Sequence, residues 1–294
     1  MTLNENNFQI IGLIIKTSIY LSLPILIYIF TATFERKLCS RTVGKMGRHQ
    51  SRGRDYLTFL QDLIKIFLKT PISYNVTSFL RLNLSPAVAF GISVLPVSVI
   101  PICESFLLNN QKMAAEILVS RYSLLLFLGL NSLNIFSAIL VGWGVNSNFS
   151  ILSNLKKSMH YLATEMIVYF IIINMIITYG TADFHDIVIM QKRHLFGFVN
   201  QLGLFIQPVL AIVFMYYITV TSSFQNSKFS FDLKHSQSGT SLSLNSIGLI
   251  LLKLTEQVKY FISAILFSFL FLGGYGLLPG LSFLVEQYSD SLYF

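Results

Sequence analysis

Long apolar runs separated by short polar segments dominate the pattern of residues along this chain. An α-helix needs ~20 apolar residues to cross roughly 30 Å of hydrocarbon, and the runs are about that long. None of them shows the short alternation of apolar and polar residues that is typical of a barrel strand. We expect spans at residues 8–34, 82–108, 117–141, 159–179, 203–222 and 244–272. The pattern therefore predicts an all-α membrane protein with about six transmembrane helices.

A shorter periodic stretch, YLTFLQDLIKIFLKTP, lies between the first two runs at residues 56–71. Its apolar residues recur at helical spacing and share one face: Leu57, Leu60, Ile64 and Leu68. The stretch is too short and too charged to span a membrane. We therefore expect an amphipathic helix that lies on the membrane interface or on a partner protein.

Composition agrees with this prediction and limits the number of domains. The chain has 294 residues, of which 53% are hydrophobic and 12% charged, whereas a soluble domain has about 25% charged residues. No polar segment is long enough to fold separately, so residues 1–294 are expected to form a single transmembrane domain. The cysteines, Cys39 and Cys103, fall near opposite predicted membrane faces, and no His or Cys spacing suggests a metal ligand set.

The basic residues are concentrated in the loops of one predicted side. Loops 35–81, 142–158 and 223–243 hold 10, 2 and 2 Lys or Arg residues, and the first of them carries most of the net charge of +8. By the positive-inside rule, this side is the cytoplasmic or matrix side, and the N-terminus lies on the opposite side. A charge confined to one loop does not indicate nucleic-acid binding.

Glu165 stands inside an apolar run, HYLATEMIVYF, where an unpaired carboxylate is costly and a functional role is the default hypothesis. Tyr161 and Tyr169 lie one turn to either side on the same face and could hydrogen-bond it. One interpretation is a proton relay. The alternative is a tether near a helix end, paired with Lys156 or Lys157.

Glu256 is a second carboxyl group in an apolar run, within the sequence KLTEQVK. Lys253 and Lys259 lie three residues away on either side, within reach on one helix. A self-compensating ion pair is therefore at least as good an interpretation as a proton conduit.

Three motifs, in order along the chain, carry a family resemblance. The first begins with FERK at residues 34–37, the second is GWGVNSNF at 142–149 followed by Glu165, and the third is NSKFSFDL at 226–233. They resemble the family of membrane subunit 1 of the proton-pumping NADH:ubiquinone oxidoreductase, respiratory complex I. The residues of the second motif that match the family pattern are Gly142, Trp143, Asn146, Ser147 and Asn148.

The resemblance implies a subunit that anchors the hydrophilic arm to the membrane arm and forms much of the quinone tunnel. Ubiquinone would be the substrate, and FMN and iron–sulfur clusters would be held by partner subunits, with no redox cofactor or metal on this chain. The implied proton-coupling carboxylates are Glu35, Glu165 and Glu256. The implied residues of the quinone cavity or arm interface are Arg36, Lys45, Asp62, Lys228, Phe231 and Asp232.

The resemblance also implies a location and partners. The phenylalanine-rich and tyrosine-rich composition fits an organelle-encoded subunit of the mitochondrial inner membrane, with its N-terminus on the intermembrane-space side. Expected partners are the quinone-module subunits of the hydrophilic arm, small membrane-arm subunits and lipid. The family has eight helices, so we expect a separate small polypeptide to supply the last two.

The sequence departs from the family pattern in ways that keep other functions open. Lys228 stands where the family has an arginine, and the acid-rich run expected after Asp232 is absent. A secondary transporter using Glu165 and Glu256 is one alternative, although we find no inverted repeat or matched pair of broken helices to favour it. A non-catalytic anchoring or assembly subunit is the other.

Overall fold

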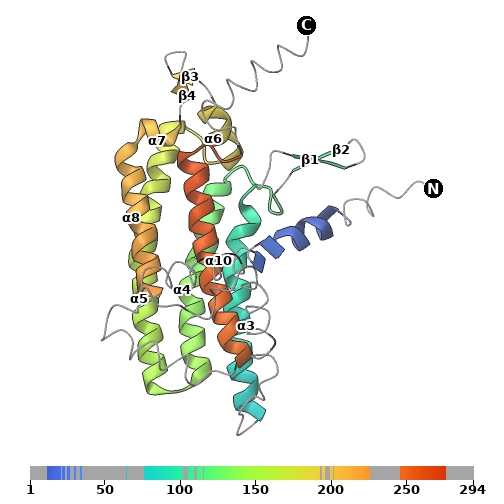
Figure 1. The fold of residues 1–294 in the computed structure, drawn as a ribbon, viewed down its shortest axis with the longest axis vertical. Helices are drawn as coiled ribbons and strands as arrows, with labels where there is room; N and C mark the ends of the chain where they lie inside the picture. Colours follow the sequence, from blue (N-terminus) through green and yellow to red (C-terminus); the bar gives the residue numbers. More distant parts are fainter. Residues whose placement is uncertain are drawn as a thin grey trace, which may run out of the picture.

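A bundle of long helices forms the body of the molecule in the computed structural model (Figure 1). The residues that the structure describes are 12–20, 22–23, 25–26, 30, 34, 64, 76–101, 105–108, 111–114, 116–192, 194–195, 199–200, 202–225 and 246–275. The long helices are α3 (Val76–Val94), α4 (Ser123–Val145), α5 (Asn148–Tyr179), α8 (Pro208–Gln225) and α10 (Ser246–Phe271). The shorter elements are the 3₁₀ helix η1 (Leu95–Val99), α6 (Phe184–Gln191), α7 (Gly203–Ile206) and the strands β1 (Ser105–Leu108), β2 (Gln111–Ala114), β3 (His194–Leu195) and β4 (Val199–Asn200).

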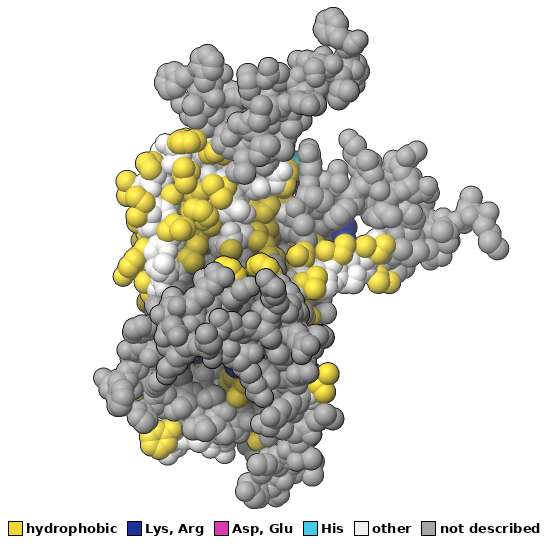
Figure 2. Space-filling view, in the orientation of Figure 1, with side chains coloured by type: hydrophobic (Ala, Val, Ile, Leu, Met, Phe, Trp, Pro, Cys, Tyr) yellow, Lys and Arg dark blue, Asp and Glu magenta, His cyan; other side chains and the backbone are white. Residues whose placement is uncertain are grey.

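Three segments of the described chain are long and apolar enough, by length and composition, to cross a membrane. They are Leu82–Val99, Ser123–Val145 and Asn148–Tyr179. Hydrophobic side chains also cover the outward surface of α8 (Figure 2), where Val209 and Ile212 are about 70% exposed. These features support an all-α membrane protein, and the count of six spans stays a prediction. The predicted amphipathic helix at 56–71 lies outside the described residues except for Ile64.

The second predicted span, 82–108, is wrong in its extent. α3 begins earlier, at Val76, and the chain turns into η1 after Val94. Pro96 and Pro101 lack the backbone N–H that a continuing helix needs, so the α-helical ladder ends there. The remaining residues contribute β1, which pairs antiparallel with β2 and is not helical.

The predicted loop 142–158 is also wrong, because most of it is helix. α4 continues to Val145 and α5 begins at Asn148, so Asn146 and Ser147 alone connect them. Asn146 adopts the left-handed conformation at φ 52°, which ends α4. The Ser147 side chain accepts a hydrogen bond from the Ser150 backbone N–H at 3.2 Å, which caps the start of α5.

The remaining predicted spans agree with helices but differ at their ends. Residues 12–20 are helical within the span predicted at 8–34, and the Tyr20 hydroxyl donates to the Ile100 carbonyl at 2.6 Å. The span predicted at 203–222 divides into α7 and α8 at Gln207, and α10 matches the last span within two residues at each end.

The short helix α6 was not predicted, and it closes one end of the bundle core. Asp183 caps its start and accepts a hydrogen bond from the Ser123 hydroxyl of α4 at 2.8 Å, while that hydroxyl accepts from the Phe184 N–H at 2.9 Å. The buried Phe184 ring packs edge-on against Phe127 of α4 and Phe269 of α10. These contacts hold α4, α6 and α10 in a fixed arrangement around the core.

Candidate functional site

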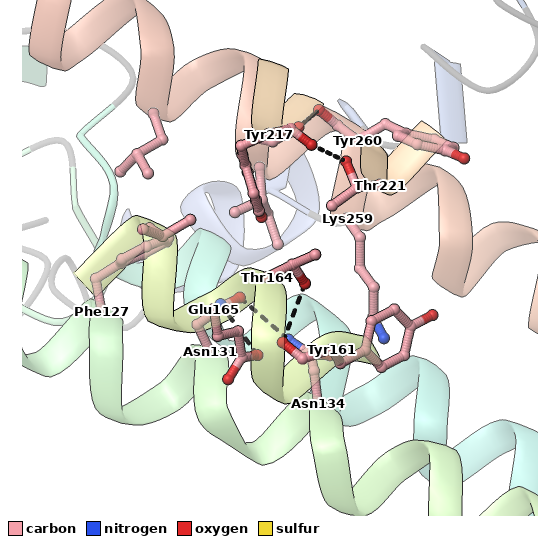
Figure 3. A pocket seen from close by; sticks show the side chains of 14 residues that line it. Phe127, Asn131, Asn134, Tyr161, Thr164, Glu165, Tyr217, Thr221, Lys259 and Tyr260 are labelled. Atoms are coloured by element: carbon pink, nitrogen blue, oxygen red, sulfur yellow. Dashed lines mark hydrogen bonds between the residues drawn. The ribbon is translucent and has the colours of Figure 1, made fainter. Parts of the chain in front are cut away.

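A cavity of about 40 Å³ lies among α4, α5, α8 and α10 (Figure 3). This volume has room for about three water molecules. Polar side chains from all four helices line it: Asn131 and Asn134 from α4, Tyr161, Thr164 and Glu165 from α5, Tyr217 and Thr221 from α8, and Lys259, Tyr260 and Ser263 from α10. A polar cavity inside an apolar bundle is the kind of place where protons and water are held.

Glu165 is the carboxyl group of this cavity, and its side chain is 6% exposed. Asn131 Nδ2 donates to Glu165 Oε1 at 3.3 Å, and the Tyr169 hydroxyl donates to Oε2 at 3.5 Å. Asn134 Nδ2 donates in turn to Asn131 Oδ1 at 3.2 Å. Glu165 is therefore held by neutral donors from two helices, which suits a group that exchanges a proton.

Two ammonium groups flank the ring of Tyr161. Lys259 Nζ lies 3.8 Å from the ring centroid, and Lys157 Nζ lies 5.9 Å from it. Lys157 Nζ also forms an ion pair with Glu256 Oε1 at 2.7 Å, which joins α5 to α10. The cations and carboxyl groups of the two helices thus form one cluster around Tyr161.

The interaction partners of the tyrosines and lysines near Glu165 differ in part from those expected from the sequence. Tyr169 hydrogen-bonds Glu165 as expected, whereas Tyr161 presents its ring to Lys259. Lys157, one candidate partner of a tethered Glu165, pairs with Glu256. The sequence offered Glu256 counter-charges on its own helix, but its ion pair reaches across to α5.

Asn131 and Asn134 are not among the site residues expected from the sequence, although their spacing could have indicated them. They stand three residues apart inside the apolar run LGLNSLN, and two amides on one face of a membrane helix point toward a buried polar partner. Asn134 is 2% exposed, and its Oδ1 has no hydrogen-bond partner among the described residues. Asn134 is nevertheless one of the residues that line the cavity.

The residues of the second motif form the end of the α4–α5 hairpin. A Cβ atom placed on Gly142 would lie 3.0 Å from Asn154 Cβ, so glycine permits close approach of the two helices. Asn146 and Ser147 make the connection described above, and Trp143 is 64% exposed beside it. Their roles in the structure are those of a packing and capping unit.

At the opposite end of α4, Glu116 is a titratable group outside the membrane-spanning helices. Burial raises its pKa to about 7, with a further increase from the negative charge of Asp183 and a decrease from the positive charge of Lys16. Lys16 Nζ also donates to the Glu116 carbonyl at 3.4 Å. This group therefore changes charge near neutral pH.

Comparison with known proteins assigns the chain to a family. The model of the NADH dehydrogenase family matches residues 15–289. The chain belongs to the NADH dehydrogenase family. It is 25% identical over 260 residues to NADH-ubiquinone oxidoreductase chain 1 of Triticum aestivum, covering 87% of this chain and 74% of that one. It is also 29% identical over 239 residues to an NADH-quinone oxidoreductase subunit of Sphingopyxis alaskensis, covering 79% of this chain and 62% of that one.

A third relative, an NADH-quinone oxidoreductase subunit of Rhizorhabdus wittichii, is 27% identical over 277 residues, which cover 90% of this chain and 73% of that one. Identities in this range make the chain a divergent member of the NADH dehydrogenase family. The matched region includes the cavity residues and the α4–α5 hairpin.

Most of the other candidate site residues of this chain lie outside the residues that the structure describes. They are Glu35, Arg36, Lys45, Asp62, Lys228, Phe231 and Asp232. Within the described ranges, no three His, Cys, Asp or Glu side chains gather into a metal-binding group. The cavity around Glu165 is therefore the candidate site on which the proposals below are based.

Proposed function

We propose that the chain is the membrane subunit of proton-pumping NADH:ubiquinone oxidoreductase that forms part of the quinone tunnel and couples quinone reduction to the proton path. The observation that carries this proposal is a buried carboxyl group, Glu165, facing a polar cavity among four helices of an NADH dehydrogenase family member. A carboxyl group at this depth is costly unless it serves a purpose.

Proton coupling needs a group that takes up and releases a proton without collapse of its surroundings. The amide of Asn131 and the phenol of Tyr169 can hydrogen-bond either charge state of Glu165, because each donor can reorient. The cavity has room for the water that would deliver and remove the proton. Glu256 and Glu35 would extend the set of proton-coupling carboxylates toward the quinone side.

The quinone side of the proposal involves residues beyond the described ranges. Ubiquinone would bind near the quinone-cavity residues identified in the sequence, while FMN and the iron–sulfur clusters lie in partner subunits. The chain would sit in the mitochondrial inner membrane with its N-terminus in the intermembrane space. Its partners would be the quinone-module subunits of the hydrophilic arm and small membrane-arm subunits.

Glu165→Gln in the intact complex tests this proposal. The amide keeps the shape and can still accept from Asn131, while its NH2 group can donate to the Tyr169 hydroxyl, but it cannot exchange a proton. We therefore expect coupled NADH:ubiquinone reduction to fall roughly 100-fold, the size of a lost acid–base group. Reduction of quinone and proton pumping are measured together in membrane vesicles.

The matched control is Lys156→Gln, an exposed lysine on the same helix, which should leave both rates unchanged. If Glu165→Gln assembles fully and retains normal reduction and pumping, Glu165 is a structural group and the proposed coupling role is wrong.

A further inference from the structure

We propose that Lys259 is a positioning residue whose ammonium group links the charge of Glu165 to that of Glu256. This inference rests on the proposed function and deepens it. Lys259 projects from α10 into the cavity, with its Nζ over the face of the Tyr161 ring (Figure 3). A charged ammonium group within a bundle of apolar membrane helices is costly, so a functional role is the default hypothesis.

The aromatic ring of Tyr161 contacts the ammonium group of Lys259. At 3.8 Å from the ring centroid, Lys259 Nζ lies well within the range of a cation–π contact, which strengthens when water is excluded. The ring attracts the ammonium group without fixing it in one ion pair. Lys259 can therefore respond to a change in the charge of either carboxyl group.

Each of the two carboxyl groups lies within electrostatic range of Lys259. Glu165 and Lys259 interact through their charges, as do Glu256 and Lys259. Lys157 is engaged by Glu256 in the 2.7 Å ion pair, so Lys259 is the cation of the cluster that faces Glu165. The asymmetry makes Lys259 the group that senses whether Glu165 is ionised.

The proposed step moves a proton and a charge but forms no covalent bond between heavy atoms. When Glu165 releases its proton to cavity water, the carboxylate attracts the Lys259 ammonium group. When Glu165 takes a proton back, that attraction is lost and the ammonium group is drawn toward Glu256. The Lys157–Glu256 ion pair then has an additional cation beside it, so the state of one carboxyl group is transmitted to the other.

The other titratable groups around Glu165 do not supply this link. The groups that face the cavity or interact with the cluster are Lys157, Tyr161 and Tyr169 from α5, Tyr217 from α8, and Glu256, Lys259 and Tyr260 from α10, while α4 offers the neutral amides Asn131 and Asn134. The tyrosines contribute phenol hydroxyl groups and no ammonium group. Lys259 is thus the cation of this set that interacts through its charge with both carboxyl groups.

Lys259→Met tests the proposal in the intact complex, because methionine keeps the length of the side chain and removes the charge. Without the positive charge of Lys259, ionised Glu165 is less favoured, so we expect the pH of half-maximal coupled activity to move upward by roughly one unit. The KM for ubiquinone should stay unchanged while the pumping rate at neutral pH falls roughly tenfold. Lys259→Arg should restore most of the wild-type pH profile.

The matched control is Lys253→Met, which removes an exposed lysine from the same helix and should leave the pH profile in place. Tyr161→Leu supplies a second variant in case Lys259→Met does not assemble, since it removes the ring but keeps the cation, and it should give a smaller shift. An unchanged pH profile in whichever of these variants assembles overturns the inference, as does equal loss in Lys259→Met and Lys259→Arg.

Glu165→Gln separates the failure of this inference from failure of the proposed function. If Glu165→Gln reduces coupling but Lys259→Met keeps the wild-type pH profile, Glu165 works without Lys259 and the inference alone is wrong. If Glu165→Gln itself has no effect, the proposed function of the cavity fails first.

Discussion

Glu116 illustrates how a single side chain acquires a pH dependence from its place in the fold. It lies just before α4, where burial and the nearby Asp183 carboxylate disfavour its charged form, and Lys16 only partly offsets them. Its pKa in the folded protein, about 7, is above its ordinary value of 4.5. The folded protein therefore binds this proton more tightly than the unfolded chain does.

The sign of the effect on stability follows from linkage. The stabilising contribution of protonated Glu116 is fully present below pH 4.5 and is lost as pH rises through about 7. We predict that Glu116→Gln removes the stability loss caused by ionisation of Glu116. Compared with the wild-type chain, the variant should therefore gain more thermal stability at pH 8 than at pH 5. Thermal unfolding of the detergent-solubilised complex across this range measures it, and a parallel change at both pH values would contradict it.

The α4–α5 hairpin shows how far the sequence determined one pair of elements. Its two runs were predicted from hydrophobicity alone, because α4 and α5 are apolar along most of their length. The connection was predicted as a loop at residues 142–158, a stretch that contains the polar residues Ser150, Ser153 and Asn154. Those side chains are buried at the hairpin end, and Asn154 Nδ2 donates to the Ser150 carbonyl at 3.0 Å.

Gly142 determines how closely the two helices of the hairpin approach. Gly142→Ala would place a methyl group 3.0 Å from Asn154 Cβ, so the Asn154 side chain must move by a few tenths of an ångström. We predict a loss of about 1–3 kcal/mol of stability, the usual cost of overpacking. The thermal midpoint of chain dissociation from the complex measures this loss.

Gly129→Ala is the control for this prediction. Gly129 lies on the same helix as Gly142, but a Cβ atom placed on it would have no neighbouring atom within 4 Å. Alanine should be neutral or slightly stabilising at that position, by up to about 1 kcal/mol of helix propensity. Equal effects of the two substitutions would show that close packing at Gly142 is not limiting.

Across the whole molecule, the fold class followed from the sequence more readily than the site did. Apolar runs predict membrane helices because the bilayer imposes their length, and Glu165 was identified because a carboxyl group in such a run is rare. The partners of Glu165 were not predictable in full. Asn131, Lys259 and the Lys157–Glu256 ion pair come together only when α4, α5 and α10 pack, and a single sequence does not specify which faces meet.

The proposal for the whole molecule predicts an assembly. A tagged chain should co-purify with an NADH-oxidising complex that reduces ubiquinone and is blocked by quinone-site inhibitors. Recovery of a transporter activity from the isolated chain, or of an assembly with no iron–sulfur arm, would contradict the prediction.

The two-residue connection between α4 and α5 also bears on how the chain enters the membrane. α5 has 32 residues and a length of about 48 Å, and its first turn follows α4 after Asn146 and Ser147 alone. A connection this short keeps the adjoining ends of the two helices next to each other. We infer that α4 and α5 insert together as a paired unit during synthesis, so that their packing precedes that of α8 and α10.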